Sequence, residues 1–136
     1  MTHHTKEKGD LGVLRAQVEI AEQGWMVLLP LTEHSPFDLV AYKNGVFKRI
    51  QVKYRTARNN TVEVTFTSSW SDKHGSHRRF VDKNDFDLYC IYCPDTNKCY
   101  FVDPNKYREG VSLRLGDTKN NQKKGVHFAS DFCTIK

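Results

Sequence analysis

The chain has 136 residues, of which 38% are hydrophobic and 12% aromatic, so we expect one globular domain over residues 1–136. No apolar run approaches the roughly 20 residues of a membrane-spanning helix, and the polar start MTHHTKEKGD lacks a signal peptide's apolar stretch. We therefore expect no membrane association and a cytoplasmic, intracellular protein. Lys and Arg total 21 against 16 Asp and Glu, and the net charge of +5 favours a polyanionic partner.

An amphipathic helix is expected first. Residues 10–23 place four apolar side chains at helical spacing, and Gly24 directly after them is suited to a C-terminal cap. The four side chains are Leu11, Leu14, Val18 and Ala21. The pattern predicts one helix that packs an apolar stripe against the rest of the fold.

Strands dominate the remainder of the chain. Short or alternating apolar runs bounded by turn residues predict them, whereas two polar segments, 71–85 and 116–125, are predicted to be loops. The expected strand segments are 25–29, a hairpin over 35–55, 61–66, a second hairpin over 86–103, and 111–115. One helix followed by several antiparallel strands indicates an α+β or mixed α/β domain.

The four cysteines do not favour a metal site. Cys90 and Cys93 have the spacing of a zinc pair, but residues three apart on a strand point to opposite faces. We expect these two thiols, with Cys99 and Cys133, to be buried or half-buried small side chains.

The first hairpin carries polar side chains where ordinary sheet residues would serve. Asn44-Gly45 is the dipeptide best suited to a two-residue turn, and such a turn fixes the register of the strands. Counting outward from it places Asp38 opposite Gln51, with Lys53 one diagonal step away on the same face. A simple ion pair between Asp38 and Lys53 is the structural alternative.

These three side chains suit phosphodiester hydrolysis. Mg²⁺ prefers hard oxygen ligands, which Asp38, the amide of Gln51 and the backbone carbonyl of Val52 can supply. Lys53 could orient or deprotonate the attacking water, or hold the phosphate as a point charge.

Several motifs together resemble one known family. Two segments of the first hairpin are SPFDLVAY, which contains Asp38, and QVKYR, which begins at Gln51. Together they resemble the core of the PD-(D/E)XK nuclease superfamily, in particular its group I intron-associated homing endonucleases. That branch has Gln at the position of Gln51. Further similar segments are KGDLG at 8–12, DLYCIYCPDTNKCYFVD at 87–103 and KNNQKKGVHFASDF at 119–132.

The resemblance implies a fold, an activity and an assembly. The fold would be an α/β (α+β), restriction-endonuclease-like core with a mixed central sheet and the N-terminal helix packed on it. The activity would be site-specific cleavage of double-stranded DNA with Mg²⁺, for which Mn²⁺ could substitute, by a homo-oligomer (dimer or tetramer). Asp38 would bind the metal, Gln51 would fill the second acidic position, and Lys53 would be the catalytic lysine.

One position departs from the family pattern. In similar sequences a glutamate of the metal site follows the KGDxG motif, and here that position is Val13. Glu19 on the helix is expected to be a surface charge. Gln17 lies close to Val13 around the helix, so it either forms a structural hydrogen bond or faces the metal site.

Basic and amide side chains beside turns are candidates for DNA contact, although each group could equally be solvated. The candidates are Arg49, Arg55 and Arg58 in and after the first hairpin, Lys73, His74, His77, Arg78 and Arg79 in the first polar segment, and Lys119, Asn120, Asn121, Gln122, Lys123 and Lys124 in the second.

Two rival functions stay open. A junction-resolving or repair nuclease with the same core would prefer branched DNA. Alternatively, Val13 and Gln51 leave Asp38 as the only acid in the motif, so the chain could be a DNA-binding module with a weakened or decayed nuclease site.

Overall fold

The computed structural model describes residues 5–116 and 124–136, which fold into one long helix, short 3-10 turns and three sheets. The helix α1 spans Thr5–Glu22. The strands are β1 (Met26–Leu28), β2 (Leu39–Lys43), β3 (Val46–Tyr54), β4 (Thr61–Thr65), β5 (Thr67–Asp72), β6 (Gly75–Phe80), β7 (Leu88–Cys93), β8 (Lys98–Val102), β9 (Gly110–Arg114) and β10 (His127–Phe128).

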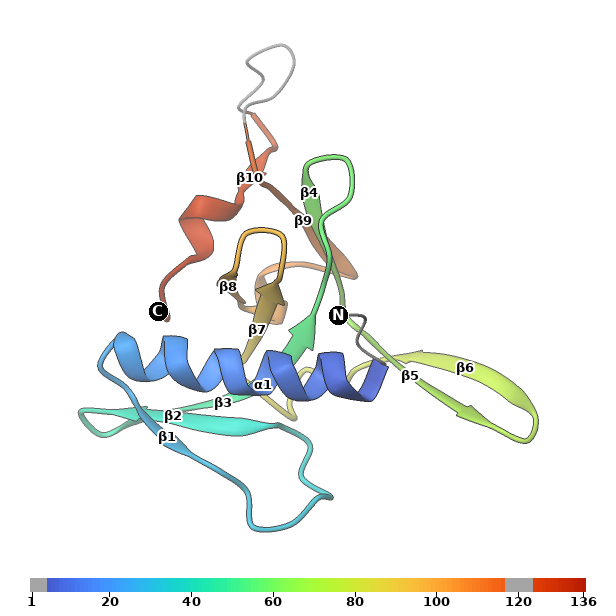
Figure 1. Cartoon of the computed structure of the whole chain (residues 1–136), viewed down its shortest axis with the longest axis horizontal. Coiled ribbons are helices and arrows are strands. Elements are labelled where there is room, and N and C mark those ends of the chain that lie inside the picture. The colour runs from blue at the N-terminus through green and yellow to red at the C-terminus, as the bar shows by residue number, and fades with distance from the viewer. Residues whose placement is uncertain (1–4, 117–123) are drawn as a thin grey trace.

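The central sheet has the strand order β1-β2-β3-β7-β8 (Figure 1). The β2–β3 and β7–β8 pairs are antiparallel hairpins, as predicted, but β3 and β7 pair in parallel. The sheet is therefore mixed, which corrects the expectation of antiparallel strands drawn from the element order. The mixed α+β architecture that the family resemblance implied is confirmed.

The turn between β2 and β3 is the predicted one. Asn44 and Gly45 both have positive φ, at 50° and 81°, as a type I′ turn requires. Lys43 pairs with Val46 and Leu39 with Ile50, so the predicted register is confirmed.

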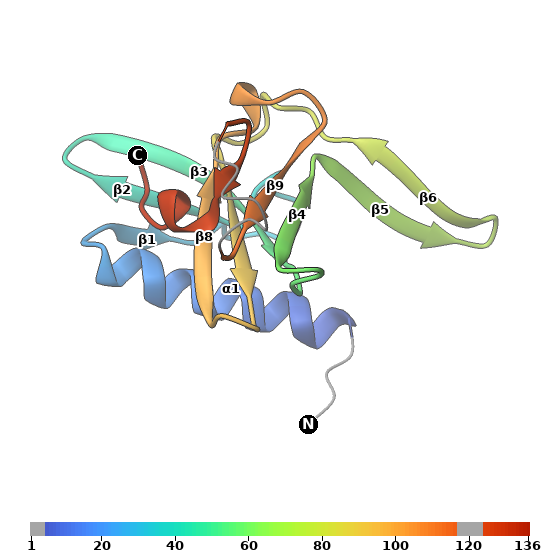
Figure 2. The same ribbon diagram turned by 90° about the horizontal axis from the view of Figure 1, so that it is seen from above.

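Helix α1 lies across one face of the central sheet (Figure 2) and begins at Thr5, earlier than predicted. Its buried face consists of Gly12, Ala16 and Ile20, whereas Leu14 and Val18 are 60% and 52% exposed. Of the predicted apolar stripe, Leu11 packs against the core, but the other three residues do not face it, so the predicted face is wrong. Small residues face the sheet because the helix lies close to it: a Cβ on Gly12 would be 3.6 Å from side-chain carbons of Val52 and Tyr54.

Gly24 ends the helix as predicted. Its φ of 87° is left-handed, and the N–H groups of Gly24 and Trp25 donate to the carbonyls of Ala21 and Ile20, at 3.0 and 3.2 Å. These two bonds form a Schellman cap.

The other face of the central sheet is covered by the small sheet β10-β9-β4. Between the two sheets lies a core that includes Phe66, Phe86, Tyr89, Ile91 and Leu113. A separate core under α1 contains Leu39, Ala41, Ile50 and Val52, among others. Strands β7 and β8 are thus buried on both faces, whereas β2 and β3 contribute buried side chains only to the core under the helix.

The cysteines follow the alternation of β7. Cys90 belongs to the core under the helix and Cys93 to the core between the sheets, so the two point to opposite faces as predicted. All four cysteines are free thiols.

The segment 71–85 is not the predicted loop. Most of it belongs to β5 and β6, which form a hairpin that stands out from the body of the molecule, with Lys73 and His74 at its turn (Figure 1). Of the second predicted loop, 116–125, residues 117–123 lie outside the described part of the chain.

One end of the central sheet keeps apolar side chains exposed. On β1, Met26 is 61% exposed and Leu28 37%, and Phe47 at the β2–β3 turn is 59% exposed. No helix in the described residues is long and apolar enough to cross a membrane.

Candidate active site

A cleft of about 850 Å³ lies where the N-terminal turns of α1, the last half of β3 and the base of the β5–β6 hairpin meet. The residues that line it are Lys8, Gly9, Pro36, Gln51, Val52, Lys53, Tyr54, Arg55, Thr67, Ser68, Ser69, Arg79, Phe80, Val81, Asp82, Asp85 and Phe86. Two of the three predicted site residues, Gln51 and Lys53, are among them.

Asp38 is fixed at the edge of this cleft by the backbone of β3. Its N–H donates to the carbonyl of Ile50 at 2.9 Å, and its carboxylate oxygen Oδ2 accepts from the N–H of Val52 at 2.7 Å. Burial raises the pKa of this carboxyl group, and the bond from Val52 partly opposes that shift. Asp38 is half-buried and has a second carboxylate oxygen for which no bond within the described residues is found.

The strand edge beside Asp38 is open. β2 begins at Leu39 opposite Ile50, whereas β3 continues to Tyr54, so none of the described strands pairs with Val52 on that side. In an extended strand the N–H and C=O of one residue point the same way. The carbonyl of Val52 therefore points toward the side on which its N–H meets Asp38.

Three groups near this edge have oxygens that could bind a metal ion. They are the Asp38 carboxylate, the Val52 carbonyl and the side-chain amide of Gln51, which lines the cleft. Within the described residues, no three His, Cys, Asp or Glu side chains gather to hold a metal. One carboxylate with neutral oxygens fits a hard cation such as Mg²⁺, which retains several waters, and would bind it weakly.

Lys53 contacts the backbone where β4 ends and β5 begins. Its Nζ donates to the carbonyl of Thr67 at 2.6 Å and to that of Thr65 at 3.3 Å, and lies 5.1 Å from the ring centre of Tyr89. No ion pair joins it to Asp38, and within the described residues Asp38 has no such partner, so the simple ion-pair alternative is wrong. Burial, aided by the charge of Arg55, lowers the pKa of Lys53 to about 8.

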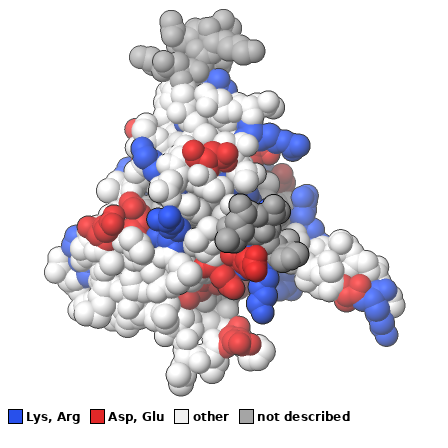
Figure 3. Space-filling model, in the orientation of Figure 1, with Lys and Arg blue, Asp and Glu red and all other residues white. Residues whose placement is uncertain are grey.

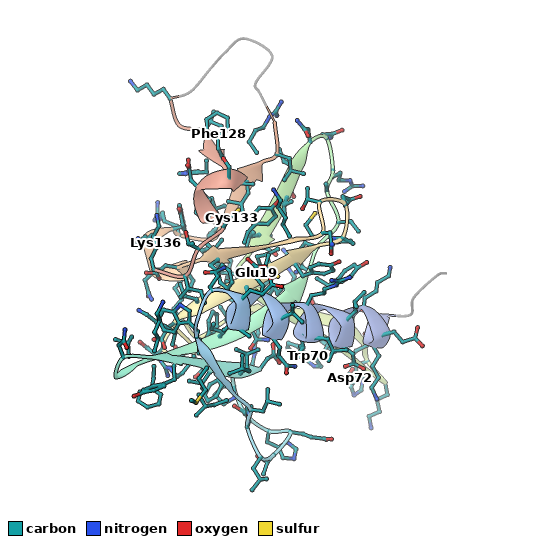
Figure 4. The ribbon with its side chains drawn as sticks, turned by 60° about the vertical axis from the view of Figure 1, so that its left-hand side comes forward. Glu19, Trp70, Asp72, Phe128, Cys133 and Lys136 are labelled. Atoms are coloured by element: carbon teal, nitrogen blue, oxygen red, sulfur yellow. The ribbon has the colours of Figure 1, made fainter. Side chains whose placement is uncertain are left out.

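None of the three helix positions considered for the missing acid lines the cleft. Val13 is half-buried and packs against the core under the helix. Gln17 is also half-buried. Glu19 is half-buried rather than a solvated charge: it accepts from Gln23 Nε2 at 3.0 Å and lies on the side of the C-terminal segment with Cys133 (Figure 4).

The three arginines of the first hairpin region have different surroundings. Arg49 forms an ion pair with Asp87 at 3.1 Å and donates to the carbonyl of Asn84, and its hydrogen bond lowers the pKa of Asp87. Arg55 is half-buried in the cleft, and this burial lowers its pKa. Arg58 is exposed. Their contacts with DNA stay predictions.

The other predicted DNA contacts divide between the projecting hairpin and the second polar segment. Lys73, His74, Arg78 and Arg79 are exposed, and Lys and Arg atoms are visible on the hairpin in Figure 3. Only Arg79 lines the cleft. Lys124 is exposed, whereas Lys119, Asn120, Asn121, Gln122 and Lys123 lie outside the described residues.

Most of the cleft residues were not identified from the sequence as functional candidates, among them four from two distant segments. Lys8 and Gly9 approach from α1, and Asp82 and Asp85 from the segment after β6. Lys8 and Gly9 belong to the KGDLG motif, but the motif was interpreted only through the position that follows it, Val13. No local pattern around Asp82 and Asp85 signals that they face β3.

Comparisons with known proteins identify a family and a similar fold. The sequence profile of the PD-(D/E)XK endonuclease family matches residues 3–135. Among solved structures, the chain is similar to that of a bacterial homing endonuclease, I-Ssp6803I, with a TM-score of 0.75 and 22% sequence identity over 96% of this chain and 88% of that chain. A search of curated proteins finds no significant match.

Proposed function

Because the chain belongs to the PD-(D/E)XK endonuclease family, we propose that it hydrolyses phosphodiester bonds of double-stranded DNA at specific sites, using Mg²⁺ held beside Asp38. The observation that carries the proposal is the bond from the Val52 N–H to Asp38 at an otherwise open strand edge. It fixes a carboxylate next to a backbone carbonyl and Gln51. Site-specific, homing-type cleavage is supported by the likeness to the homing endonuclease fold.

The proposed roles follow from these positions. A divalent cation at Asp38, Val52 and Gln51 would neutralise charge that develops on the phosphate and lower the pKa of a bound water. Lys53 would act as the general base. A neutral amine has two N–H donors, which match the carbonyls of Thr65 and Thr67, and a lone pair that can accept a proton from water.

We also propose one nuclease domain over residues 1–136 that acts as a homo-oligomer. A duplex has two strands, and one chain supplies one Asp38 site. The exposed apolar side chains Met26, Leu28 and Phe47 at one end of the central sheet support contact with a second copy of the chain.

The test compares binding and cleavage in the same samples. Wild type should cut linear duplex DNA in Mg²⁺ but not in EDTA, and Mn²⁺ should substitute. Asp38→Asn should still bind DNA, because an asparagine oxygen can accept the hydrogen bond from Val52 and keep the local structure. It should fail to cut, because the amide lacks the negative charge that holds the metal. Stronger cutting of branched than of linear DNA would favour a junction-resolving nuclease, and binding without any cleavage by wild type would favour the decayed site.

The Val13→Glu variant tests the decayed-site alternative directly. On this alternative the loss of a carboxylate at position 13 weakened the metal site, so restoring one should raise cleavage at a fixed Mg²⁺ concentration, at some cost in stability because Val13 packs against the core. Asp38→Asn/Val13→Glu is the control. If the single variant cuts no better than wild type, position 13 does not contribute to the metal site.

A further inference from the structure

The β5–β6 hairpin is a two-stranded ribbon that pairs only with itself among the described strands. It stands out from the body of the molecule (Figures 1 and 2), and its base, through Ser68, Ser69 and Arg79, forms one wall of the cleft. Almost all of its side chains are exposed. A segment with so little apolar burial contributes little to the core, so its sequence is free to serve a contact outside the molecule.

Toward its tip, one face of the ribbon carries short hydroxyl side chains and one arginine. Ser69 pairs with Arg78 and Ser71 with Ser76, so these four side chains share the outer part of a face, which we call the hydroxyl face. At the base of the ribbon the same face carries the pair of Thr67 and Phe80, and Phe80 is 61% exposed. All four are exposed, and the hydroxyls of Ser71 and Ser76 lie 3.3 Å apart. Within the described residues, Arg78 has no hydrogen bond or ion pair.

The opposite face is packed on itself. Trp70 stacks on His77 with ring centroids 5.1 Å apart, and the Arg79 guanidinium lies 5.6 Å from the Trp70 ring. His77 also contacts Asp72 at 2.9 Å, and Figure 4 labels Trp70 and Asp72 on this stacked face. These contacts stiffen an otherwise isolated ribbon. They involve His77 and Arg79, so Arg78 is the arginine of the hairpin whose guanidinium has no contact with another side chain among those described.

We propose that the β5–β6 hairpin enters the major groove of duplex DNA with its hydroxyl face toward the base edges, where Arg78 recognises a guanine. The inference rests on the proposed function, namely that the chain binds duplex DNA. The major groove of B-DNA is about 12 Å wide and admits a two-stranded ribbon, whereas the minor groove, about 6 Å wide, admits one only when the DNA is deformed. Serines let the ribbon backbone approach the bases closely, and an arginine can donate two bonds to guanine O6 and N7.

The stacked face acts differently in this arrangement. Its bulky Trp70 would keep the ribbon backbone away from the base edges if that face were turned inward. Facing outward, it holds the ribbon straight, and Arg79 reaches the cleft beside Lys53 and Arg55. We therefore assign base recognition to Arg78 and backbone contact to Arg79, although the two residues are neighbours in the sequence.

The experiment selects bound sequences from a pool of random 40-bp duplexes, in EDTA so that no DNA is cut. Wild type should enrich a motif that contains a guanine, and the preference for guanine at that position should depend on Arg78. Arg78→Ala should lose about 5- to 150-fold of the preference for that guanine, the range measured for one bidentate base contact. Arg78→Lys keeps the charge and should lose most of the same preference, while Arg79→Ala, the matched control, should weaken binding to all sequences alike.

Base analogues locate the groove. Replacing the guanine by 7-deazaguanine removes the major-groove N7 and should weaken binding by wild type but not by Arg78→Ala. Replacing it by inosine removes only the minor-groove amino group and should change neither. The inference is overturned if Arg78→Ala lowers affinity equally for all sequences with a flatter salt dependence, which indicates a phosphate contact, or if inosine alone weakens binding.

The two proposals fail in different ways. If wild type binds no duplex at all, the proposed function is wrong and the hairpin assignment falls with it. If wild type binds and enriches a motif that Arg78→Ala also enriches, the nuclease proposal stands and the hairpin assignment alone is wrong.

Discussion

At the scale of single residues, Lys53 is the side chain whose surroundings most directly affect chemistry. It is half-buried, it is held by the carbonyls of Thr65 and Thr67, and its pKa is lowered to about 8. An ordinary lysine, with a pKa near 10.4, is almost fully protonated at neutral pH and cannot serve as a base there.

We expect the cleavage rate to rise with pH and to level off above about pH 8. The neutral amine is the active form of a general base, and its fraction increases as pH rises through the pKa. Single-turnover rates at saturating Mg²⁺ between pH 6 and 9.5 provide the measurement. Lys53→Arg cannot lose its proton and should be nearly inactive throughout. A rate that falls above pH 8 would show instead that Lys53 acts as a cation.

Tyr89, whose ring lies next to the Lys53 ammonium group, tests how one buried hydroxyl group affects the stability of the fold. Its hydroxyl is buried and has no hydrogen-bond partner among the described residues, and burial raises the pKa of the phenol to about 12. Tyr89→Phe should therefore leave the free energy of unfolding unchanged or raise it by about 1 kcal/mol, because an unsatisfied polar group is removed. Urea titration measures this.

Tyr100→Phe is the matched control. Tyr100 is equally buried, at 3% exposure against 0% for Tyr89, but its hydroxyl bonds to Thr96 at 2.9 Å. Its removal should cost about 1 kcal/mol. If both variants lose the same stability, the Tyr89 hydroxyl has a partner in solution.

At the scale of elements, the distance between neighbouring backbones decides which glycines can be replaced by alanine without loss of stability. Gly110 on β9 faces β4, and a Cβ added there would lie only 2.5 Å from the backbone carbonyl oxygen of Val64. Gly9 on α1 would place a Cβ with no atom within 4 Å. The same substitution should therefore have opposite effects at the two positions.

We expect Gly110→Ala to lower the free energy of unfolding by about 1–3 kcal/mol, because β4 and β9 must move apart. Gly9→Ala should raise it by about 0.5–1 kcal/mol, since alanine is the better helix former. Thermal and urea unfolding measure both. Equal effects at the two sites would show that the β4–β9 pair adjusts without strain.

Elements also differ in how well local sequence predicts them. The β2–β3 register could be predicted because a two-residue Asn-Gly turn determines it within a few residues. The helix was found but its buried face was not, because Gly12 and Ala16 face the sheet while Leu14 and Val18 face solvent. Hydrophobic periodicity does not detect a helix face that is buried because its side chains are small. The β5–β6 hairpin was missed because neither of its faces joins the main core.

At the scale of the whole molecule, the exposed end of the central sheet predicts a change in assembly. Met26→Glu places a charge on a side chain that is 61% exposed, where it should leave the monomer folded but disfavour contact with a second copy. Sedimentation velocity should show a shift to smaller species. Leu14→Glu on α1, at 60% exposure, is the matched control and should not change the assembly. Dissociation by Leu14→Glu alone would place the interface on the helix.

By itself the sequence determined the strand pairs joined by tight turns, the register of β2 and β3, and the opposite placement of Cys90 and Cys93. Those features depend on backbone alternation and turn geometry, which act over a few residues. Only the tertiary structure decided that β3 and β7 run parallel, that Lys53 turns to Thr65 and Thr67 rather than to Asp38, and that Lys8, Arg79 and Asp82 share one cleft. These arrangements join segments that are far apart in the chain, and the packing of α1 and the second sheet on the two faces of the central sheet brings them together.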